Sequence, residues 1–386
     1  MSTPPAADAP AVLANWQDPP HNRWAFQHVR ELVPTARLER SPAPRPLPPG
    51  EPLDLGAVRV GGQTVEEALA SSFADGLLVL QDGAIRAERY LNGLTPSRPH
   101  LLMSVSKSLV ATVAGILAGR GELDPDGSVV AVLPELEGTS WEGATVRHLL
   151  DMRTGTRFDE TYANVDADVR RYEQIYLWRP RTTPGLPVDA RDYMAGLSNS
   201  GPHGGPFDYR SILTDMLGWV LERVSGTRLP QLLERELWQP MGAEFDADVT
   251  VDGVGNAMAD GGVCATLRDV ARFGQLWLDR GVVDGRQLVP EAWIRDTLQG
   301  GPDSRDAYAA SSSADFFPGA FYRNKLWIVQ PDVPVYAGLG INGQSVFVHE
   351  PARLVVARLS SWPAALDPTL EELELELVHA LADALG

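Results

Sequence analysis

The 386-residue chain has one cysteine, few basic residues and no long hydrophobic run. Cys264 has no second cysteine with which to form an internal disulfide or a paired-cysteine metal site. The 33 Lys and Arg residues against 51 Asp and Glu give a net charge of −18, which disfavours binding to nucleic acid or to an anionic membrane. No apolar run reaches ~18 residues, and the N-terminus lacks a basic segment followed by an apolar one. We therefore expect a soluble cytoplasmic protein that binds neither nucleic acid nor membranes.

Several widespread catalytic motifs are also missing. The chain contains no G-x-S-x-G, H-E-x-x-H, C-x-x-C or G-x-x-x-x-G-K-[ST] pattern, so other hydrolase folds, zinc hydrolysis and nucleotide use have no signature. The seven histidines are scattered without the spacing of metal ligands, and Cys264, after two glycines, is typical of a small buried filler. We expect neither a metal site nor a cofactor.

Strand patterns near both ends of the chain enclose a mainly helical middle. Residues 1–50 are rich in proline and favour an extended arm, which is either anchored to the body of the protein by Trp24 and Phe26 or a partly ordered tail. The β-prone runs lie at 77–90, which contains a turn at Asp82-Gly83, and at 326–329, 345–349 and 354–359. Helical patterns begin at Ser106 and at Asp367, the second with acids Glu371 and Glu372 in its first turn. This order predicts an α+β fold in which both chain ends build one antiparallel sheet.

The predicted boundaries follow the same pattern. We expect an N-terminal arm over 1–50, an α/β domain over 51–121 and 261–386, and a mainly helical subdomain over 122–260.

Ser104 and Lys107 lie at the start of the predicted buried helix and are three residues apart, so they share one helix face. A serine needs a base to attack a carbonyl, and burial together with the helix dipole lowers a lysine pKa so that the amine can serve. Backbone N–H groups at the same helix start can stabilise an oxyanion. The pattern alone is weak, because a surface cap followed by a solvated lysine would look the same.

Two further elements follow in the chain. Tyr209 lies 105 residues after Ser104, between a Gly-rich loop and a helix pattern, where a tyrosine can project into a cleft. The stretch Gly340–Gln344 precedes a strand, and its glycines let the backbone approach a ligand closely. A half-buried tyrosine and a hairpin turn are the alternative interpretations.

In this order the three elements resemble the serine β-lactamase and penicillin-recognising superfamily, and within it the 6-aminohexanoate-dimer hydrolases and related carboxylesterases. The resemblance covers most of residues 70–380. It implies a β-lactamase-like sheet flanked by helices, with the active site in the cleft beside the inserted helical subdomain. It also implies that Ser104 is the nucleophile, that Lys107 is its base and that Tyr209 carries the proton to the leaving group. The oxyanion hole would be the backbone N–H groups of Ser104 and Ile341. Whether Lys107 or Tyr209 is the base during acylation stays open.

The same resemblance implies a set of substrate-binding residues. Tyr162 matches a mobile loop tyrosine, Glu173 an acidic residue that faces a substrate ammonium, and Trp178 a tryptophan that faces the substrate. The remaining members of the set are Trp327, Asn342 and Gly343.

The substrate class follows from one departure from the family pattern. β-Lactamases carry K-T-G where this chain has Gly340-Ile341-Asn342, so a β-lactam carboxylate would lose a charge-assisted contact of ~1.5–3 kcal/mol. The leading hypothesis is a cofactor-free serine hydrolase that cleaves linear amides or carboxyl esters through acyl-Ser104, including 6-aminohexanoate oligomers. The alternatives are a β-lactamase or D-alanyl-peptidase and a non-catalytic ligand-binding protein on the same fold. The oligomeric state is open, with a homodimer as one option.

Overall fold

The computed structural model describes residues 10–386, so the first nine residues of the predicted arm lie outside the described part. The helices are α1 Asn22–Ala25, α2 Val65–Ser71, α3 Val105–Gly119, α4 Val129–Val132, α5 Val146–Leu150, α6 Asp168–Ile175, α7 Ala190–Ala195, α8 Ile212–Ser225, α9 Leu229–Leu233, α10 Leu267–Leu278, α11 Glu291–Gln299, α12 Ser304–Ala309 and α13 Pro368–Leu385. The strands are β1 Thr35–Leu38, β2 Arg59–Val60, β3 Gln63–Thr64, β4 Ala74–Gln81, β5 Ala84–Tyr90, β6 His100–Leu101, β7 Ala247–Thr250, β8 Val263–Ala265, β9 Val282–Val283, β10 Arg286–Gln287, β11 Phe321–Arg323, β12 Leu326–Gln330, β13 Val335–Gly340, β14 Gln344–His349 and β15 Leu354–Ser360.

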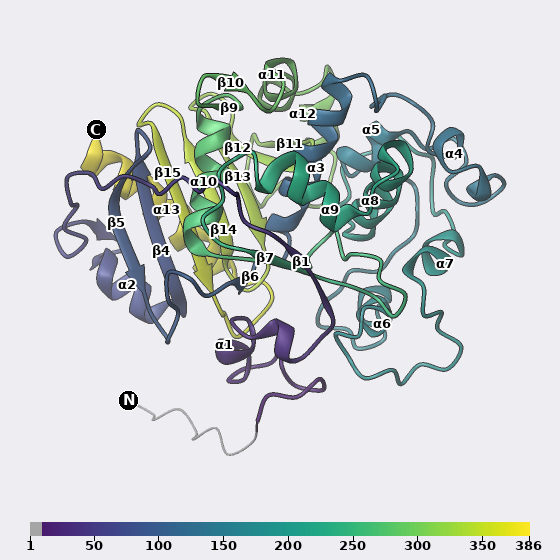
Figure 1. Ribbon diagram of the computed structural model, residues 1–386, viewed down its shortest axis with the longest axis horizontal. Coiled ribbons are helices and arrows are strands. Elements are labelled where there is room, and N and C mark those ends of the chain that lie inside the picture. The colour runs from purple at the N-terminus through teal and green to yellow at the C-terminus, as the bar shows by residue number, and fades with distance from the viewer. Residues whose placement is uncertain (1–9) are drawn as a thin grey trace.

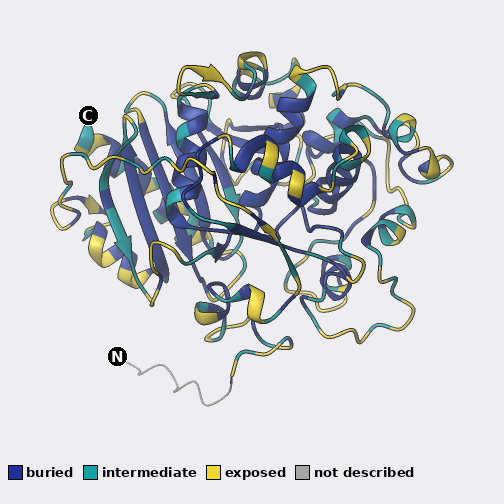
Figure 2. Ribbon diagram, viewed as in Figure 1, coloured by how far each residue is buried: buried dark blue, intermediate teal, exposed yellow. Residues whose placement is uncertain are grey.

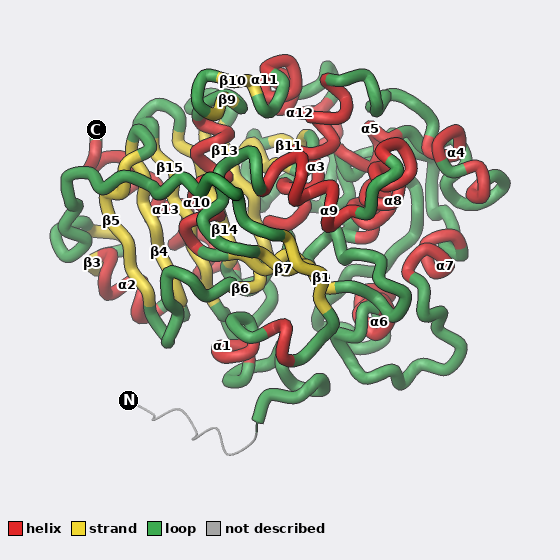
Figure 3. Tube along the Cα trace, viewed as in Figure 1, coloured by secondary structure: helices red, strands yellow, loops and turns green. Residues whose placement is uncertain are grey.

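A seven-stranded antiparallel sheet forms one side of the molecule, in the order β11-β12-β13-β14-β15-β4-β5 (Figures 1 and 3). The last strand in the chain, β15, pairs with β4 near its beginning, which confirms the expected sheet built from both ends. The predicted turn between β4 and β5 is also confirmed, because Asp82 and Gly83 have φ angles of 48° and 77°. The strands β11 and β13 were not among the predicted ones.

Helices cover both faces of this sheet. Neighbouring residues of a strand point to opposite faces, and in β14 Val346 lies against α10 at Gly274, whereas the Ser345 hydroxyl donates to Glu374 of α13. An added Cβ at Gly274 would come within 2.7 Å of Val346, so the missing side chain lets α10 pack tightly. Helices α3 and α10 therefore lie on one face and α13 on the other. Helix α3 and most of the sheet are buried, whereas the edge strand β5 is only partly buried (Figure 2).

The predicted helical middle contains α4 to α9, and a smaller sheet ties it to the rest of the chain. This sheet has the order β1-β7-β8-β6, so β7 of the middle segment lies between β1 of the arm and β8. The division into domains stays a prediction. No helix among residues 10–386 is both long and apolar enough to span a bilayer.

The described part of the arm is anchored by aromatic side chains. Phe26 is fully buried, as predicted, and Trp16 is 1% exposed. The prediction for Trp24 is wrong, because its side chain is 43% exposed and stacks on His28 instead. A sequence pattern shows where aromatic residues occur but not which of them a short helix such as α1 turns inward.

Candidate active site

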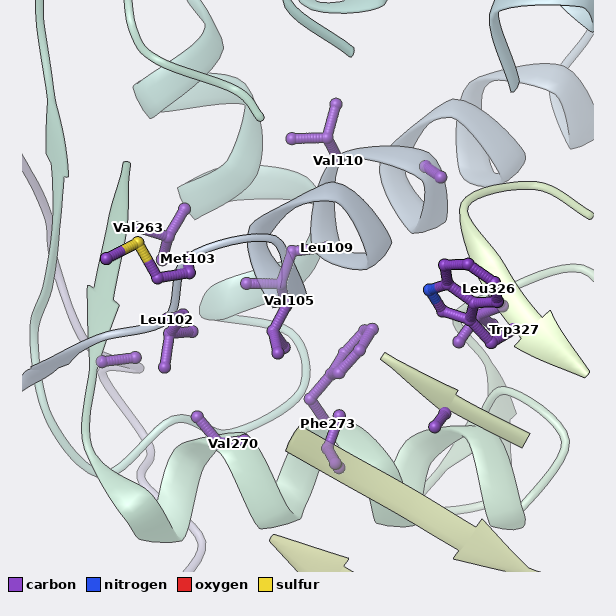
Figure 4. Close-up of a cluster of buried hydrophobic side chains, with 14 of the residues drawn as sticks. Leu102, Met103, Val105, Leu109, Val110, Val263, Val270, Phe273, Leu326 and Trp327 are labelled. Carbon is purple, nitrogen blue, oxygen red and sulfur yellow. The ribbon is translucent and has the colours of Figure 1, made fainter. Parts of the chain in front are cut away.

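Ser104 lies at the N-cap of α3, directly after a residue with a strained backbone. Met103 has a φ of +46°, a left-handed conformation that a side chain makes costly and that is concentrated at functional sites. The helix that follows is rigidly held, since Val105 and Leu109 belong to the same buried cluster as Phe273 of α10 (Figure 4). The turn therefore presents Ser104 from a fixed support.

Lys107 is buried beside this serine. Its ammonium donates to Ser104 Oγ at 2.6 Å and to the backbone carbonyl of Asp260 at 2.7 Å. Burial lowers the pKa of Lys107, but the nearby Tyr209, Asp260 and Glu160 side chains raise it by more, so the pKa is raised overall. The expectation that burial favours the neutral amine is thus corrected, because acidic groups from distant parts of the chain converge on it.

A second buried carboxyl group, that of Asp215, holds the backbone turn whose Asp260 carbonyl binds Lys107. Asp215 in α8 accepts the backbone N–H groups of Ala259, at 2.7 Å, and of Asp260, at 3.3 Å. Burial and the nearby Asp260 raise the pKa of Asp215, and burial raises the pKa of Asp260 to about 6. No sequence motif pointed to this pair, which comes together only because α8 packs beside the 259–260 turn.

Tyr209 completes the predicted group. The Lys107 Nζ atom lies 5.2 Å from the centre of the Tyr209 ring, and that ring stacks on Trp327 at 5.7 Å with an interplanar angle of 20°. Burial raises the pKa of the Tyr209 hydroxyl, while the Lys107 charge opposes the shift. The structure therefore brings Ser104, Lys107 and Tyr209 together, as the sequence order suggested.

The end of β13 lies against the nucleophile turn. An added Cβ at Gly340 would be 2.7 Å from the carbonyl oxygen of Leu102 and 2.9 Å from the backbone nitrogen of Ser104. Only glycine allows this approach, which places the following residue, Ile341, beside the serine. Within residues 10–386, neither the Ser104 nor the Ile341 backbone N–H has a hydrogen-bond acceptor in the protein. The two predicted oxyanion-hole donors are thus available for a ligand.

A cavity of about 370 Å³ opens next to Ser104. Its wall is largely aromatic and aliphatic and includes Phe316, Phe317, Trp327, Leu339 and Phe347. Apolar walls with a few convergent polar groups are typical of small-molecule sites.

Two of the residues predicted to contact the substrate, Tyr162 and Trp327, line this cavity. The Tyr162 hydroxyl donates to Glu160 at 2.6 Å, and Glu160 also accepts the backbone N–H and the hydroxyl of Ser211. Glu160 was not singled out from the sequence, although it lies two residues before Tyr162 in the same loop.

Asn342 and Gly343 form the turn after Ile341. Asn342 lines a neighbouring cavity of about 480 Å³, and its amide donates to the carbonyl groups of Trp362 and Ala364. Gly343, with a φ of +80°, lies directly against the Trp362 indole. The Asn342 amide donors therefore hold the turn in place. Asn342 and Gly343 thus affect the site mainly by fixing the backbone conformation of the turn.

Two of the predicted substrate contacts are corrected. Trp178 is 3% exposed, its indole N–H donates to Thr250 Oγ1 at 3.1 Å, and it lines neither of the two cavities. Glu173 is buried and forms ion pairs with Arg170, at 2.8 Å, and with Arg179. Its charge is thus already balanced inside the protein, because α6 turns the carboxylate inward to the two arginines. Sequence spacing alone does not show which way a helix turns a side chain.

Titratable groups elsewhere do not suggest a metal centre. Among residues 10–386, no group of three or more His, Cys, Asp or Glu side chains is arranged to hold a metal ion. Cys264 is buried in β8, and burial raises the pKa of its thiol, so it is a structural residue as interpreted from the sequence.

Comparisons with known proteins show a family match and relatives that cover most of the chain. The family model described as beta-lactamase matches residues 63–380. The chain is 38% identical over 360 residues to the 6-aminohexanoate-dimer hydrolase of Paenarthrobacter ureafaciens. This alignment covers 93% of this chain and 90% of that protein. The solved structure named "Putative 6-aminohexanoate-dimer hydrolase" from Bacillus anthracis superposes with a TM-score of 0.88 at 23% identity, over 99% of both chains. A family VIII carboxylesterase superposes with a TM-score of 0.62 at 16% identity, over 87% of this chain and 99% of that one. The two superpositions show a shared fold.

Proposed function

The chain belongs to the beta-lactamase family, and from that premise we propose that it is a serine hydrolase that cleaves linear amides or carboxyl esters through an acyl-Ser104 intermediate. The observation that carries the proposal is the 2.6 Å contact between the buried Lys107 Nζ and the Oγ of Ser104, which lines the cavity together with Tyr209. A ligand-binding protein without catalytic activity would not need a buried lysine on a serine hydroxyl.

In the acylation step, Ser104 Oγ attacks the carbonyl carbon, and the hydroxyl proton passes to the Lys107–Tyr209 pair. The carbonyl oxygen becomes an oxyanion that accepts the backbone N–H groups of Ser104 and Ile341. The tetrahedral intermediate then collapses, the bond to the leaving nitrogen or oxygen breaks, and the pair returns the proton to that atom. The products are acyl-Ser104 and a free amine or alcohol.

Deacylation repeats these steps with water as the nucleophile. Water adds to the acyl carbon, gives a proton to the Lys107–Tyr209 pair, and the bond to Ser104 Oγ breaks as the proton returns to the serine. Because Lys107 is charged in the resting state, the pair must lose one proton before it can accept the proton of the serine. The reactive protonation state is therefore a property of the Lys107–Tyr209 pair and is not assigned to one residue.

The substrate class rests on the relatives and on the charge of the cavity. A protein 38% identical to this chain is a 6-aminohexanoate-dimer hydrolase, and a carboxylesterase shares the fold. No Lys, Arg or His is among the described residues that line the cavity beside Ser104, so a β-lactam carboxylate would find no cation there. Linear amides and esters fit this cavity better than penicillins do.

Turnover assays test the proposal. Wild type, Ser104→Ala and the control Ser97→Ala, which removes an exposed hydroxyl, are given 6-aminohexanoate dimer, p-nitrophenyl butyrate and nitrocefin. We expect wild type and Ser97→Ala to hydrolyse the dimer or the ester and Ser104→Ala to hydrolyse neither. Equal turnover by Ser104→Ala would refute the nucleophile, and efficient hydrolysis of nitrocefin alone would favour the β-lactamase alternative. The cytoplasmic location and the homodimer stay predictions.

A further inference from the structure

Two glutamates of α13 line the same cavity as the proposed nucleophile. Glu371 and Glu374 are three residues apart on the helix and therefore lie on one face. Glu374 is 6% exposed, and one of its carboxylate oxygens accepts the Ser345 hydroxyl at 2.6 Å. The other oxygen has no hydrogen-bond donor among residues 10–386, and the nearest cation, Arg358 Nη1, is 3.9 Å from the oxygen that Ser345 already binds. A largely buried carboxylate thus faces the cavity with an unused acceptor.

The Glu371 carboxylate has even fewer polar partners than that of Glu374. The Glu371 side chain is half-buried, and in the described part of the chain its carboxylate has neither an ion pair nor a hydrogen bond. Burial, together with the charges of Glu374 and Asp367, raises the pKa of Glu371 to about 7. Placing two acidic groups together in a largely apolar cavity is costly unless a cation compensates them.

The described cavity lining supplies no such cation, and Arg358, which does not line the cavity, can balance only one of the two charges. This lining contains no Lys, Arg or His, and its third acidic residue, Glu160, is already held by Tyr162 and Ser211. Leu339 and Phe347 lie in the wall on the sheet face that α13 covers, since Leu339 pairs in register with Ser345 and Phe347 is two residues further along β14. The cavity therefore joins the nucleophile, an apolar wall and an acidic end.

We propose that Glu371 and Glu374 form a subsite for a cationic group of the substrate, so that the enzyme selects amides or esters that carry an amine or ammonium at the end of an apolar chain. The inference rests on the proposed function, because the subsite shares its cavity with Ser104. It also replaces Glu173, whose charge is balanced by arginines, as the acidic group that meets a substrate cation.

Matched pairs of esters test the subsite. Ethyl 6-aminohexanoate and ethyl heptanoate differ by an ammonium in place of a methyl group on the acyl side. Hexanoyl choline and 3,3-dimethylbutyl hexanoate differ on the leaving-group side by a quaternary ammonium nitrogen in place of a quaternary carbon. Hydrolysis is followed by titration of the released acid, and the readout is the kcat/KM ratio of the cationic to the neutral ester within each pair. Using both pairs shows on which side of the scissile bond the cation binds.

We expect wild type to prefer the cationic ester in at least one pair, and we expect Glu371→Gln to lower that ratio ~10–100-fold, the range of a charge-assisted contact. The matched control is Glu372→Gln, which removes an exposed charge one residue away and should keep the wild-type ratio. A second variant, Glu374→Gln, should also lower the ratio, and thermal unfolding reports whether it remains folded. The subsite is refuted if wild type hydrolyses the neutral and the cationic ester of each pair with equal kcat/KM. It is also refuted if Glu371→Gln and Glu372→Gln give the same ratio of kcat/KM for the cationic to the neutral ester. If wild type hydrolyses none of the four esters, the proposed esterase activity fails instead.

Discussion

Gly340→Ala should damage the oxyanion hole without removing any functional group. The new Cβ would lie 2.7 Å from the Leu102 carbonyl oxygen, 2.9 Å from the Ser104 nitrogen and 3.0 Å from Met103 Cβ. Comfortable contacts between such atoms are ~3.5–4.0 Å, so the end of β13 must retreat by about 0.5–1 Å from the nucleophile turn. That movement carries the Ile341 N–H away from the oxyanion.

Displacements of this size near the reacting atoms cost about 10²-fold in rate, as does the loss of one oxyanion-hole donor. We therefore expect kcat/KM for p-nitrophenyl butyrate to fall ~10²-fold, which corresponds to about 2.7 kcal/mol of transition-state stabilisation. Overpacking should also lower the free energy of unfolding by ~1–3 kcal/mol, measured by urea denaturation.

The matched control is Gly201→Ala, because a Cβ at Gly201 meets no atom within 4 Å and Gly201 has no positive φ. This variant should keep wild-type activity and stability. If Gly340→Ala retained a kcat/KM within about threefold of wild type, the close approach of β13 would not matter for catalysis, and the assignment of the Ile341 N–H would be wrong.

Two further predictions concern the charge state of the site and the corrected tryptophan. Because the pKa of Lys107 is raised, the fraction of the Lys107–Tyr209 pair that has lost a proton grows through the alkaline range. The kcat/KM for a neutral ester should therefore rise with pH in that range. A pH profile of kcat/KM that is flat above about pH 7 would contradict this prediction. Trp178→Ala should lower the free energy of unfolding, measured by urea denaturation, by ~3–5 kcal/mol, because the indole is buried against Trp16. The kcat/KM for p-nitrophenyl butyrate should change little. A large fall in kcat/KM with little loss of stability would instead indicate that Trp178 contacts the substrate.

The catalytic group was predictable because its signals are local or lie in a fixed order. Ser104 and Lys107 share one helix face wherever that helix lies, and the order of Tyr209 and the Gly340–Gln344 stretch matched a known family. The tight turn at Asp82-Gly83 was predictable for the same reason, since two residues determine it.

Properties that depend on groups distant in the sequence could not be predicted. The raised pKa of Lys107 depends in part on Asp260 and Glu160, which come near it only once the chain has folded. In the sequence, Glu371 is simply an acid in the first turn of a helix, a placement that the helix dipole explains by itself. Only the position of α13 on the sheet turns that acid toward the cavity.

The most direct test of the central claim is mass spectrometry of the intact protein during turnover of p-nitrophenyl butyrate, followed by peptide mapping of the trapped acyl group. The account predicts that wild type gains the mass of one butyryl group, that the group maps to Ser104, and that Ser104→Ala gains none. Equal labelling of both proteins, or continued turnover by Ser104→Ala, would contradict an acyl-Ser104 mechanism.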